Sequence, residues 1–139
     1  MKKKLVHVGV AVSDLSRSVA TFSKLFGMTD VPTETVADQK VRLAFFHTAG
    51  ASVELTEPTS PDSPIAKFIA KRGEGVHHLS FEVDDIRAEL ARLKAEGFQL
   101  IDEEPRAGAG GYLIAFVHPK STNGVLVEIS EKIAPGSGH

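Results

Sequence analysis

Two segments of this chain share one pattern, and this repeat limits the possible folds more than any other feature. His7–Leu15 (HVGVAVSDL) and His78–Ile86 (HLSFEVDDI) each begin with a histidine, continue as an alternating apolar run, and end with an aspartate followed by an aliphatic residue. Alternation with a period of two is typical of a half-buried strand. A chain of 139 residues holds both copies within one domain of ordinary size. The repeat therefore predicts a pseudo-symmetric domain.

Each copy continues with the same order of elements. Apolar residues at three- and four-residue spacing predict a helix after each first strand, and glycine suits the helix ends. These helices are Leu15–Phe26, ending at Gly27, and Ile86–Leu93, ending at Gly97. Strand-like runs follow at Val41–Phe46, Ser52–Thr56, Leu113–Val117 and Gly124–Ser130, with weaker ones near 29–35 and 99–103. Each half is thus predicted to be a β-α-β-β-β module.

The fold class that follows is α+β, with two tandem βαβββ modules forming a curved mixed sheet around a cleft, which the four residues discussed next identify as a metal cleft. We expect one domain over residues 1–134 and a tail at 135–139. The modules span about 4–58 and 75–131, and a bridging helix at about 63–72 joins them, with Ser63 suited to cap it.

Four residues stand at matching places on the predicted non-helix face of the sheet. His7 and His78 begin the first strands, while Glu54 and Glu128 lie on the last strands between apolar neighbours. Two imidazoles and two carboxylates in register predict a divalent-metal site. This donor set suits Co, Zn, Ni, Fe or Mn better than Ca or Mg, which prefer oxygen ligands alone. His77 competes with His78, but strand alternation and the repeat select His78.

Small and polar residues beside this set suggest where a ligand is held. Gly9 and Ser80 leave room on the same strand faces, and Lys120 and Ser121 offer a cation and a hydroxyl for a phosphate. The glycine-rich stretch Gly108–Gly111 lacks the ending of a phosphate-binding P-loop. It is either a loop at the cleft mouth or a plain hairpin connection.

Composition excludes several other functions. The net charge of −2 argues against a nucleic-acid partner, and the absence of cysteine excludes thiol catalysis and disulfides. No apolar run approaches the roughly 18 residues of a membrane span, and the segment after the N-terminal lysines is interpreted as a strand, not a signal peptide. We therefore expect a cytoplasmic protein without a membrane partner.

The repeat and several longer motifs resemble the methylmalonyl-CoA epimerases of the vicinal oxygen chelate (glyoxalase/bleomycin resistance/dioxygenase) superfamily. The motifs that carry the resemblance include SPDSPIAKF at residues 60–68, GEGVHH at 73–78, DEEPR at 102–106, HPKST at 118–122 and GVLVE at 124–128. The match covers about residues 4–131.

The resemblance implies an isomerase of propionate metabolism that epimerises an acyl-CoA, methylmalonyl-CoA, at C2. It implies one divalent ion per chain, commonly Co(II), with Zn, Ni or Mn possible, held by His7, Glu54, His78 and Glu128. A homodimer is expected by analogy with the superfamily. One relative's proposed second acid/base carboxylate aligns near Leu43, which has no ionisable group.

Epimerisation removes the C2 proton and returns one to the opposite face, which two acid/base groups accomplish most simply. Glu128 is the candidate for one, and the second stays open among Glu54, a metal-bound water and another cleft residue. Three alternatives remain: a glyoxalase I-type lyase acting on a hemithioacetal, an extradiol dioxygenase, and a non-catalytic small-ligand-binding protein of the same fold.

Overall fold

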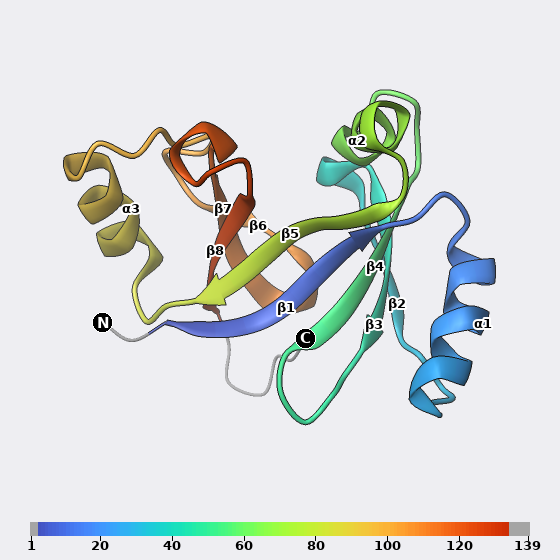
Figure 1. Cartoon of the computed structure of the whole chain (residues 1–139). Helices are drawn as coiled ribbons and strands as arrows, with labels where there is room; N and C mark the ends of the chain where they lie inside the picture. The colour runs from blue at the N-terminus through green and yellow to red at the C-terminus, as the bar shows by residue number, and fades with distance from the viewer. Residues whose placement is uncertain (1–2, 134–139) are drawn as a thin grey trace. The chain divides into compact units, whose positions relative to one another are not determined.

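The computed structural model describes residues 3–133 (Figure 1). Its helices are α1 (Leu15–Phe26), α2 (Pro64–Arg72) and α3 (Ile86–Ala95), with short 3₁₀ helices η1 (Ala37–Gln39), η2 (Ala109–Gly111) and η3 (Pro119–Ser121). Its strands are β1 (Lys4–Ala11), β2 (Thr33–Val36), β3 (Val41–Phe46), β4 (Ser52–Pro58), β5 (Gly75–Glu82), β6 (Arg106–Ala107), β7 (Tyr112–Val117) and β8 (Leu126–Lys132). The tail expected at 135–139 lies outside the described residues.

The strands follow the hydrogen-bonded order β2-β3-β4-β1-β5-β8-β7-β6. The β5–β8 pair is parallel, whereas β2–β3, β3–β4, β6–β7 and β7–β8 are antiparallel. The sheet is therefore mixed, and the predicted α+β class with its repeated β-α-β-β-β order is confirmed.

The chain divides into two compact units. Unit 2 is Val8–His77, and unit 1 combines the residues up to His7 with those from His78 onward. The strands β1 and β5 therefore contribute residues to both units, so the compact units are not the same segments as the modules of the sequence.

The core of unit 2 lies between α1 and one face of its strands. Val12, Ala44, Phe46 and Leu55 are buried there with Leu15 of α1. The apolar stripe of α1 adds the partly buried Val19, Phe22 and Phe26 to this cluster. Since Val53 and Leu55 face α1, the intervening Glu54 faces away from it, as the alternation predicted.

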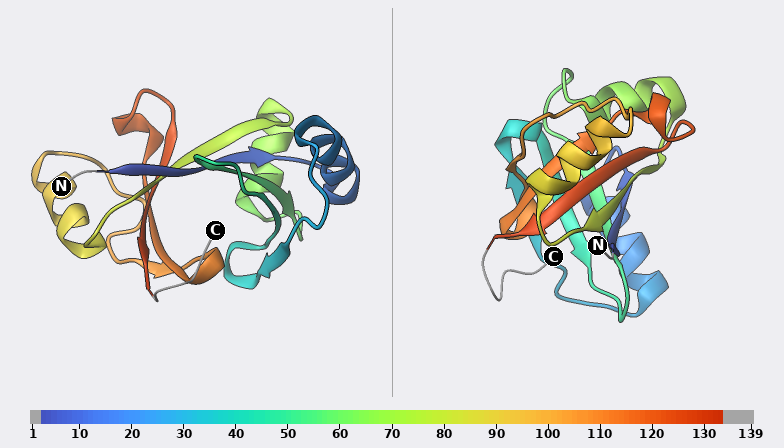
Figure 2. Two further views of the ribbon diagram at one scale, coloured as in Figure 1. Left: turned by 90° about the horizontal axis from the view of Figure 1, so that it is seen from below. Right: turned by 90° about the vertical axis from the view of Figure 1, so that its left-hand side faces the viewer.

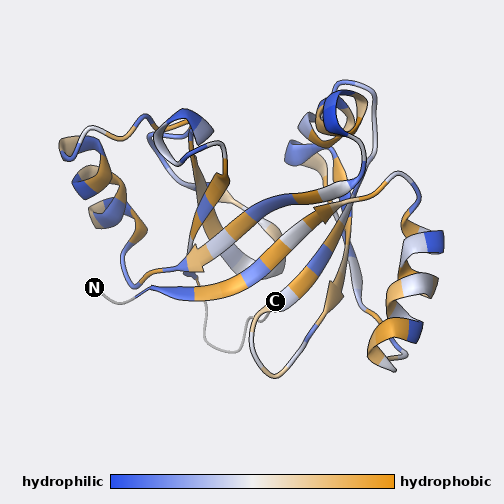
Figure 3. Cartoon of the chain, viewed as in Figure 1, coloured by the Kyte–Doolittle hydropathy of each residue, from blue (hydrophilic) through white to orange (hydrophobic). Residues whose placement is uncertain are grey.

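The core of unit 1 repeats this arrangement around α3, which packs against β8 (Figure 2). Its buried members are Val83, Ile86, Leu90, Leu93, Ala115, Val117 and Ile129. Partly buried Phe81 and Val127 pack against the same cluster, so the alternate residues of β5 and β8 lie on the other face. Figure 3 shows the corresponding alternation of hydrophobic and hydrophilic residues along β1.

Each long helix begins at the aspartate that closes the repeat. The carboxylate of Asp14 accepts a hydrogen bond from Arg17 N, and that of Asp85 accepts one from Ala88 N, both at 3.1 Å. Gly27 ends α1 in the left-handed conformation, with φ 65°. These predicted helix boundaries follow from standard capping chemistry. The bridging helix α2 likewise begins after Ser63, whose hydroxyl accepts from Ile65 N.

The largest differences between the predicted and observed strands lie in the second module. Residues 99–103 contain only an isolated bridge between Leu100 and Val117, and the second strand of that module is instead the short β6. The last strand begins at Leu126, not Gly124, because Asn123 and Gly124 form a turn with φ 57° and 85°. Within residues 3–133, none of the helices has the length and apolar character needed to cross a bilayer.

Candidate functional site

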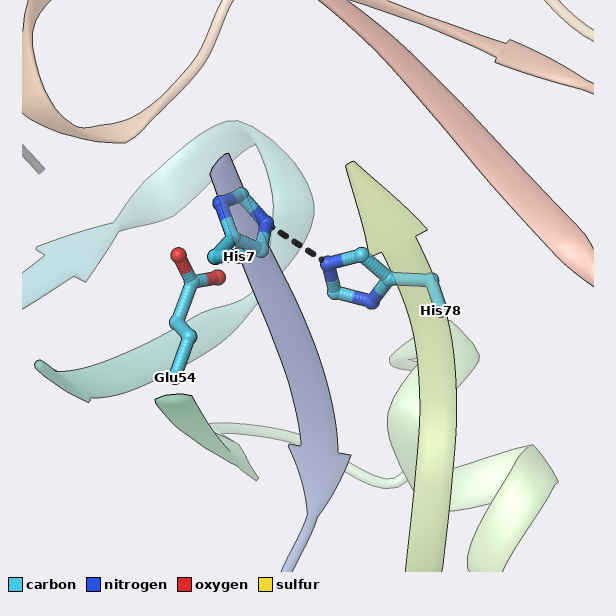
Figure 4. Close-up of side chains that lie close together, drawn as sticks. All are labelled: His7, Glu54 and His78. Atoms are coloured by element: carbon cyan, nitrogen blue, oxygen red, sulfur yellow. Dashed lines mark hydrogen bonds between the residues drawn. The ribbon is translucent and has the colours of Figure 1, made fainter. Parts of the chain in front are cut away.

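Three buried polar side chains meet within unit 1. His7 comes from β1, His78 from β5 and Glu128 from β8, and the last two lie on the sheet face away from α3. The Nε2 atoms of the two histidines are 3.0 Å apart (Figure 4), and His7 Nε2 lies 3.2 Å from Glu128 Oε1. The three residues are only 1%, 5% and 5% exposed. The site therefore concentrates two imidazoles and a carboxylate away from bulk water.

The spacing of these donor atoms fits a shared metal ion. Ligand atoms that each lie about 2.0–2.2 Å from one ion are themselves roughly 3 Å apart. The contacts from His7 Nε2 to His78 and to Glu128 both have this length. Imidazole nitrogen with carboxylate oxygen is also the donor set that Zn, Co and their neighbours accept.

The surroundings of Glu128 favour its ionised form. Burial alone raises the pKa of this carboxyl, but hydrogen bonding from His7 and the electrostatic influence of His7 and His78 outweigh it, so the pKa lies below the ordinary value. Ser80 lies opposite Glu128 in the parallel β5–β8 pair and donates a further hydrogen bond to it. A carboxylate kept ionised is the form that binds a cation or accepts a proton.

Glu54 belongs to unit 2 and is described within it. It lies on β4 opposite Phe45 of β3, on the strand face away from α1, and is 5% exposed. Figure 4 draws Glu54 with His7 and His78, and all three are buried residues with metal-binding donor atoms. The matching positions of Glu54 and Glu128 in their modules are the basis for predicting Glu54 as a metal ligand, and that role stays a prediction.

The other described histidines have partners of their own. His77 packs edge-on against the ring of Phe68 of α2, with centroids 4.8 Å apart, as expected for the competitor of His78. His47 stacks with Phe45, and His118 Nδ1 accepts a hydrogen bond from Lys120 N in the η3 turn. None of these contacts involves the three-residue set in unit 1.

The residues expected to hold substrate lie in different surroundings. Gly9 is buried on β1, and Ser80 is fully buried, with its Oγ 3.4 Å from Ser130 Oγ. Lys120 is exposed in η3, and the Ser121 hydroxyl accepts a hydrogen bond from Gln99 N. A role for these four residues in binding substrate stays a prediction.

Two polar pairs on the same face of unit 1 were not recognised in the sequence. Tyr112 OH donates to Glu82 Oε1 at 3.0 Å, and burial followed by this hydrogen bond raises the pKa of Tyr112 to about 12. Arg106 lies over the ring of Phe116 and 3.5 Å from Asp102. Alternation along β5 and β7 places Glu82 and Phe116 on the predicted site face, but no sequence signal marked the residues that would contact them.

Comparison with known proteins gives consistent results. Residues 6–116 match the Glyoxalase/Bleomycin resistance protein/Dioxygenase superfamily. The chain is 41% identical over 128 residues to the uncharacterized protein YqjC of Bacillus subtilis, covering 92% of this chain and 91% of that protein. It is 38% identical over 130 residues to the mitochondrial methylmalonyl-CoA epimerase of Dictyostelium discoideum, covering 93% and 78% of the two chains.

A solved structure of methylmalonyl-CoA epimerase in complex with methylmalonyl-CoA and NH4+ superposes with a TM-score of 0.89 at 33% identity, covering 99% of both chains. These matches confirm the resemblance to methylmalonyl-CoA epimerases predicted from the sequence motifs. The chain is a member of the glyoxalase/bleomycin resistance protein/dioxygenase superfamily.

Proposed function

We propose that this protein is a metal-dependent methylmalonyl-CoA epimerase, which inverts C2 of its acyl-CoA substrate by removing and returning a proton. The observation that carries the proposal is the buried His7, His78 and Glu128 set in a chain 38% identical to a methylmalonyl-CoA epimerase. The similar epimerase structure described above contains bound methylmalonyl-CoA, which supports the same substrate for this chain.

The proposed ligands of the ion are His7, Glu54, His78 and Glu128. The first, third and fourth have the donor spacing described above, and Glu54 is included because it is the counterpart of Glu128 in the duplicated module. A divalent ion, Co(II) in our proposal with Zn, Ni or Mn as alternatives, supplies Lewis-acid polarisation of the thioester carbonyl when bound.

The chain's own residues handle the proton. In this proposal Glu128 accepts the C2 proton on a carboxylate oxygen, while the electron pair of the C2–H bond moves toward the thioester carbonyl to form an enolate. A second group then protonates C2 from the opposite face and completes the inversion. Glu54 is our candidate for this group, because it is the counterpart of Glu128 in the other module. Leu43, near which a relative's proposed second carboxylate aligns, has no ionisable group.

The substrate contacts, the oligomeric state and the cellular role are further parts of this proposal. Gly9 and Ser80 are proposed to leave room for the acyl group, and Lys120 and Ser121 to contact CoA. The homodimer, the cytoplasmic location and the place in propionate metabolism also stay predictions, and sedimentation of the purified protein would test the first of these.

The test uses metal analysis and solvent exchange on the purified protein. We expect about one divalent ion per chain, loss of activity after exhaustive chelation, and recovery with Co(II). In D₂O, one epimer of methylmalonyl-CoA should yield the opposite epimer carrying deuterium at C2. Absence of deuterium at C2 under these conditions would contradict the epimerase proposal, and turnover of a glutathione hemithioacetal instead would favour the lyase.

A further inference from the structure

Arg106 presents a cation to the face of unit 1 that carries His78 and Glu128. It lies opposite Ile114 in the β6–β7 pair, and its guanidinium carbon is 5.9 Å from the centroid of the Phe116 ring. Ile114 and Phe116 alternate with Ala115 and Val117, which are buried against α3. Arg106 therefore belongs to the opposite, site-bearing face of the strands.

Phe116 links this arginine to the candidate metal ligands. Its ring meets the His78 ring edge-on, with centroids 6.0 Å apart, and its backbone lies opposite Glu128 in the β7–β8 pair. The guanidinium is thus one aromatic ring away from an imidazole of the set. A substrate that binds at the metal ligands and extends past Phe116 would reach Arg106.

The arginine is oriented before any ligand arrives. Asp102 Oδ1 lies 3.5 Å from Arg106 Nε, and Asp102 Oδ2 accepts a hydrogen bond of 2.9 Å from the backbone N–H of Phe116. The Asp102 carboxylate is thereby held against β7, the same strand whose Phe116 ring lies beneath the Arg106 guanidinium. Such an anchor lowers the conformational entropy that an arginine loses when it binds a ligand.

The guanidinium also keeps donors available. The side chain of Arg106 is 41% exposed, and its described contact with Asp102 is made through Nε. A guanidinium has five N–H donors in a planar fork, which matches the paired oxygens of a carboxylate or a phosphate. A purely structural ion pair does not require this exposure on the site face.

We propose that Arg106 binds an oxyanion of the acyl-CoA substrate, either the free carboxylate of the acyl group or a phosphate of CoA. This inference rests on the proposed function. It assigns Arg106 to substrate recognition, a role that the sequence patterns alone did not indicate.

The experiment measures binding by calorimetry and turnover separately. Methylmalonyl-CoA and methylmalonyl-pantetheine, which lacks the phosphates, are titrated into wild type, Arg106→Gln, Arg106→Lys and the control Arg87→Gln. Arg87 is an exposed arginine on α3, which packs on the other sheet face. Loss of one charge-assisted interaction should raise Kd about tenfold in Arg106→Gln, with a smaller rise in Arg106→Lys and none in Arg87→Gln.

The two substrates identify which oxyanion is bound. A Kd increase for methylmalonyl-CoA alone assigns Arg106 to a CoA phosphate, and an equal increase for both assigns it to the acyl carboxylate. Unchanged Kd values for both, or a lower melting temperature as the only effect of Arg106→Gln, would overturn the proposal. If the wild-type protein binds the substrate without exchanging its C2 proton, the epimerase proposal is refuted, and the Kd comparison still tests whether Arg106 binds an oxyanion. If the wild-type protein binds neither thioester, both proposals are overturned.

Discussion

Glu57 and Glu131 perform the same structural task in the two modules. Glu57 Oε2 accepts a hydrogen bond of 2.7 Å from Leu15 N, the first residue of α1, and Glu131 Oε1 accepts one of 2.8 Å from Ile86 N, the first residue of α3. Each follows a candidate metal-binding glutamate of the same strand by three residues, so each strand places its two carboxylates on opposite faces. The inner carboxylate is a candidate metal ligand, and the outer one accepts a hydrogen bond from a helix N-terminus.

Replacing either capping carboxylate should destabilise the protein without removing its proposed metal ligands. Glu57→Gln and Glu131→Gln keep an amide oxygen that can accept the hydrogen bond but lose the negative charge at the positive end of a helix. Because both contacts are partly buried, each change should cost about 1–2 kcal/mol. Urea denaturation measures the loss. The control is Glu103→Gln, whose pair with Lys94 is exposed and screened by solvent, so its loss should change stability little. Equal losses in all three variants would contradict the capping role.

The two adjacent histidines of β5 should differ sharply in metal binding. His78→Ala removes an Nε2 atom of the donor set and should abolish tight binding of Co(II), whereas His77→Ala removes a ring packed on Phe68 and should leave it largely intact. Titration followed by metal analysis after gel filtration separates the two. The reverse result would show that the strand faces are assigned wrongly.

Glu128→Gln tests whether this residue does more than bind metal. The amide keeps an oxygen donor but cannot accept the C2 proton, so turnover should fall by a factor on the order of 10² to 10⁴. Deuterium incorporation at C2 and metal content are measured on the same preparation. A variant that keeps both its metal and full exchange would place the base elsewhere.

Glu89 should make folding sensitive to acid. It is 1% exposed and contacts Lys3 Nζ at 2.8 Å and Arg92 Nε at 3.0 Å. The hydrogen bonds from Arg92 lower the pKa of Glu89 from 4.5 to about 2. Burial opposes this shift, and the contact with Lys3 adds to it. Because the folded pKa is the lower one, protonation favours the unfolded state as the pH falls from about 4.5 toward 2.

The matched comparison is Glu89→Gln. At pH 7 it should be less stable than wild type by about 1–3 kcal/mol, and the difference should shrink steadily as the pH falls through this range. Denaturation curves at several pH values measure it. A difference that stays constant down to pH 2 would exclude Glu89 as the group responsible.

A side chain at position 108 should destabilise the fold. A Cβ built there would lie 2.7 Å from Cγ2 of Ile114, which is 2% exposed, so Gly108→Ala must displace a buried residue. We expect a loss of about 1–3 kcal/mol, typical of overpacking. Combining Gly108→Ala with Ile114→Ala should cost less than the sum of the single changes in thermal denaturation, because the clash is gone. Strict additivity would argue against this contact.

The repeat explains why so much of this protein could be predicted from its sequence. Alternation and helix periodicity are local signals, and they predicted β3 at Val41–Phe46 and α1 at Leu15–Phe26 with the observed bounds. The same alternation identified the faces of His78 and Glu128, because a strand side chain has only two directions available.

The remaining features depend on contacts between distant segments. β6 has only two residues and no hydrophobic pattern of its own, and its position depends on pairing with β7 across the close approach of Gly108 to Ile114. Arg106 gains its place over Phe116 only through that pairing. No periodicity within residues 99–107 could have indicated either feature.

The parallel pairing of Ser80 with Glu128 also protects the protein against a particular error. If β8 slipped by one residue, every side chain would change faces, and the Glu128 carboxylate would enter the apolar layer beneath α3 while Val127 or Ile129 took its place. A mispaired chain would lose its core together with its donor atoms. One register of β8 therefore sets both the packing beneath α3 and the position of the candidate ligand, so an error in that register would show as a loss of stability.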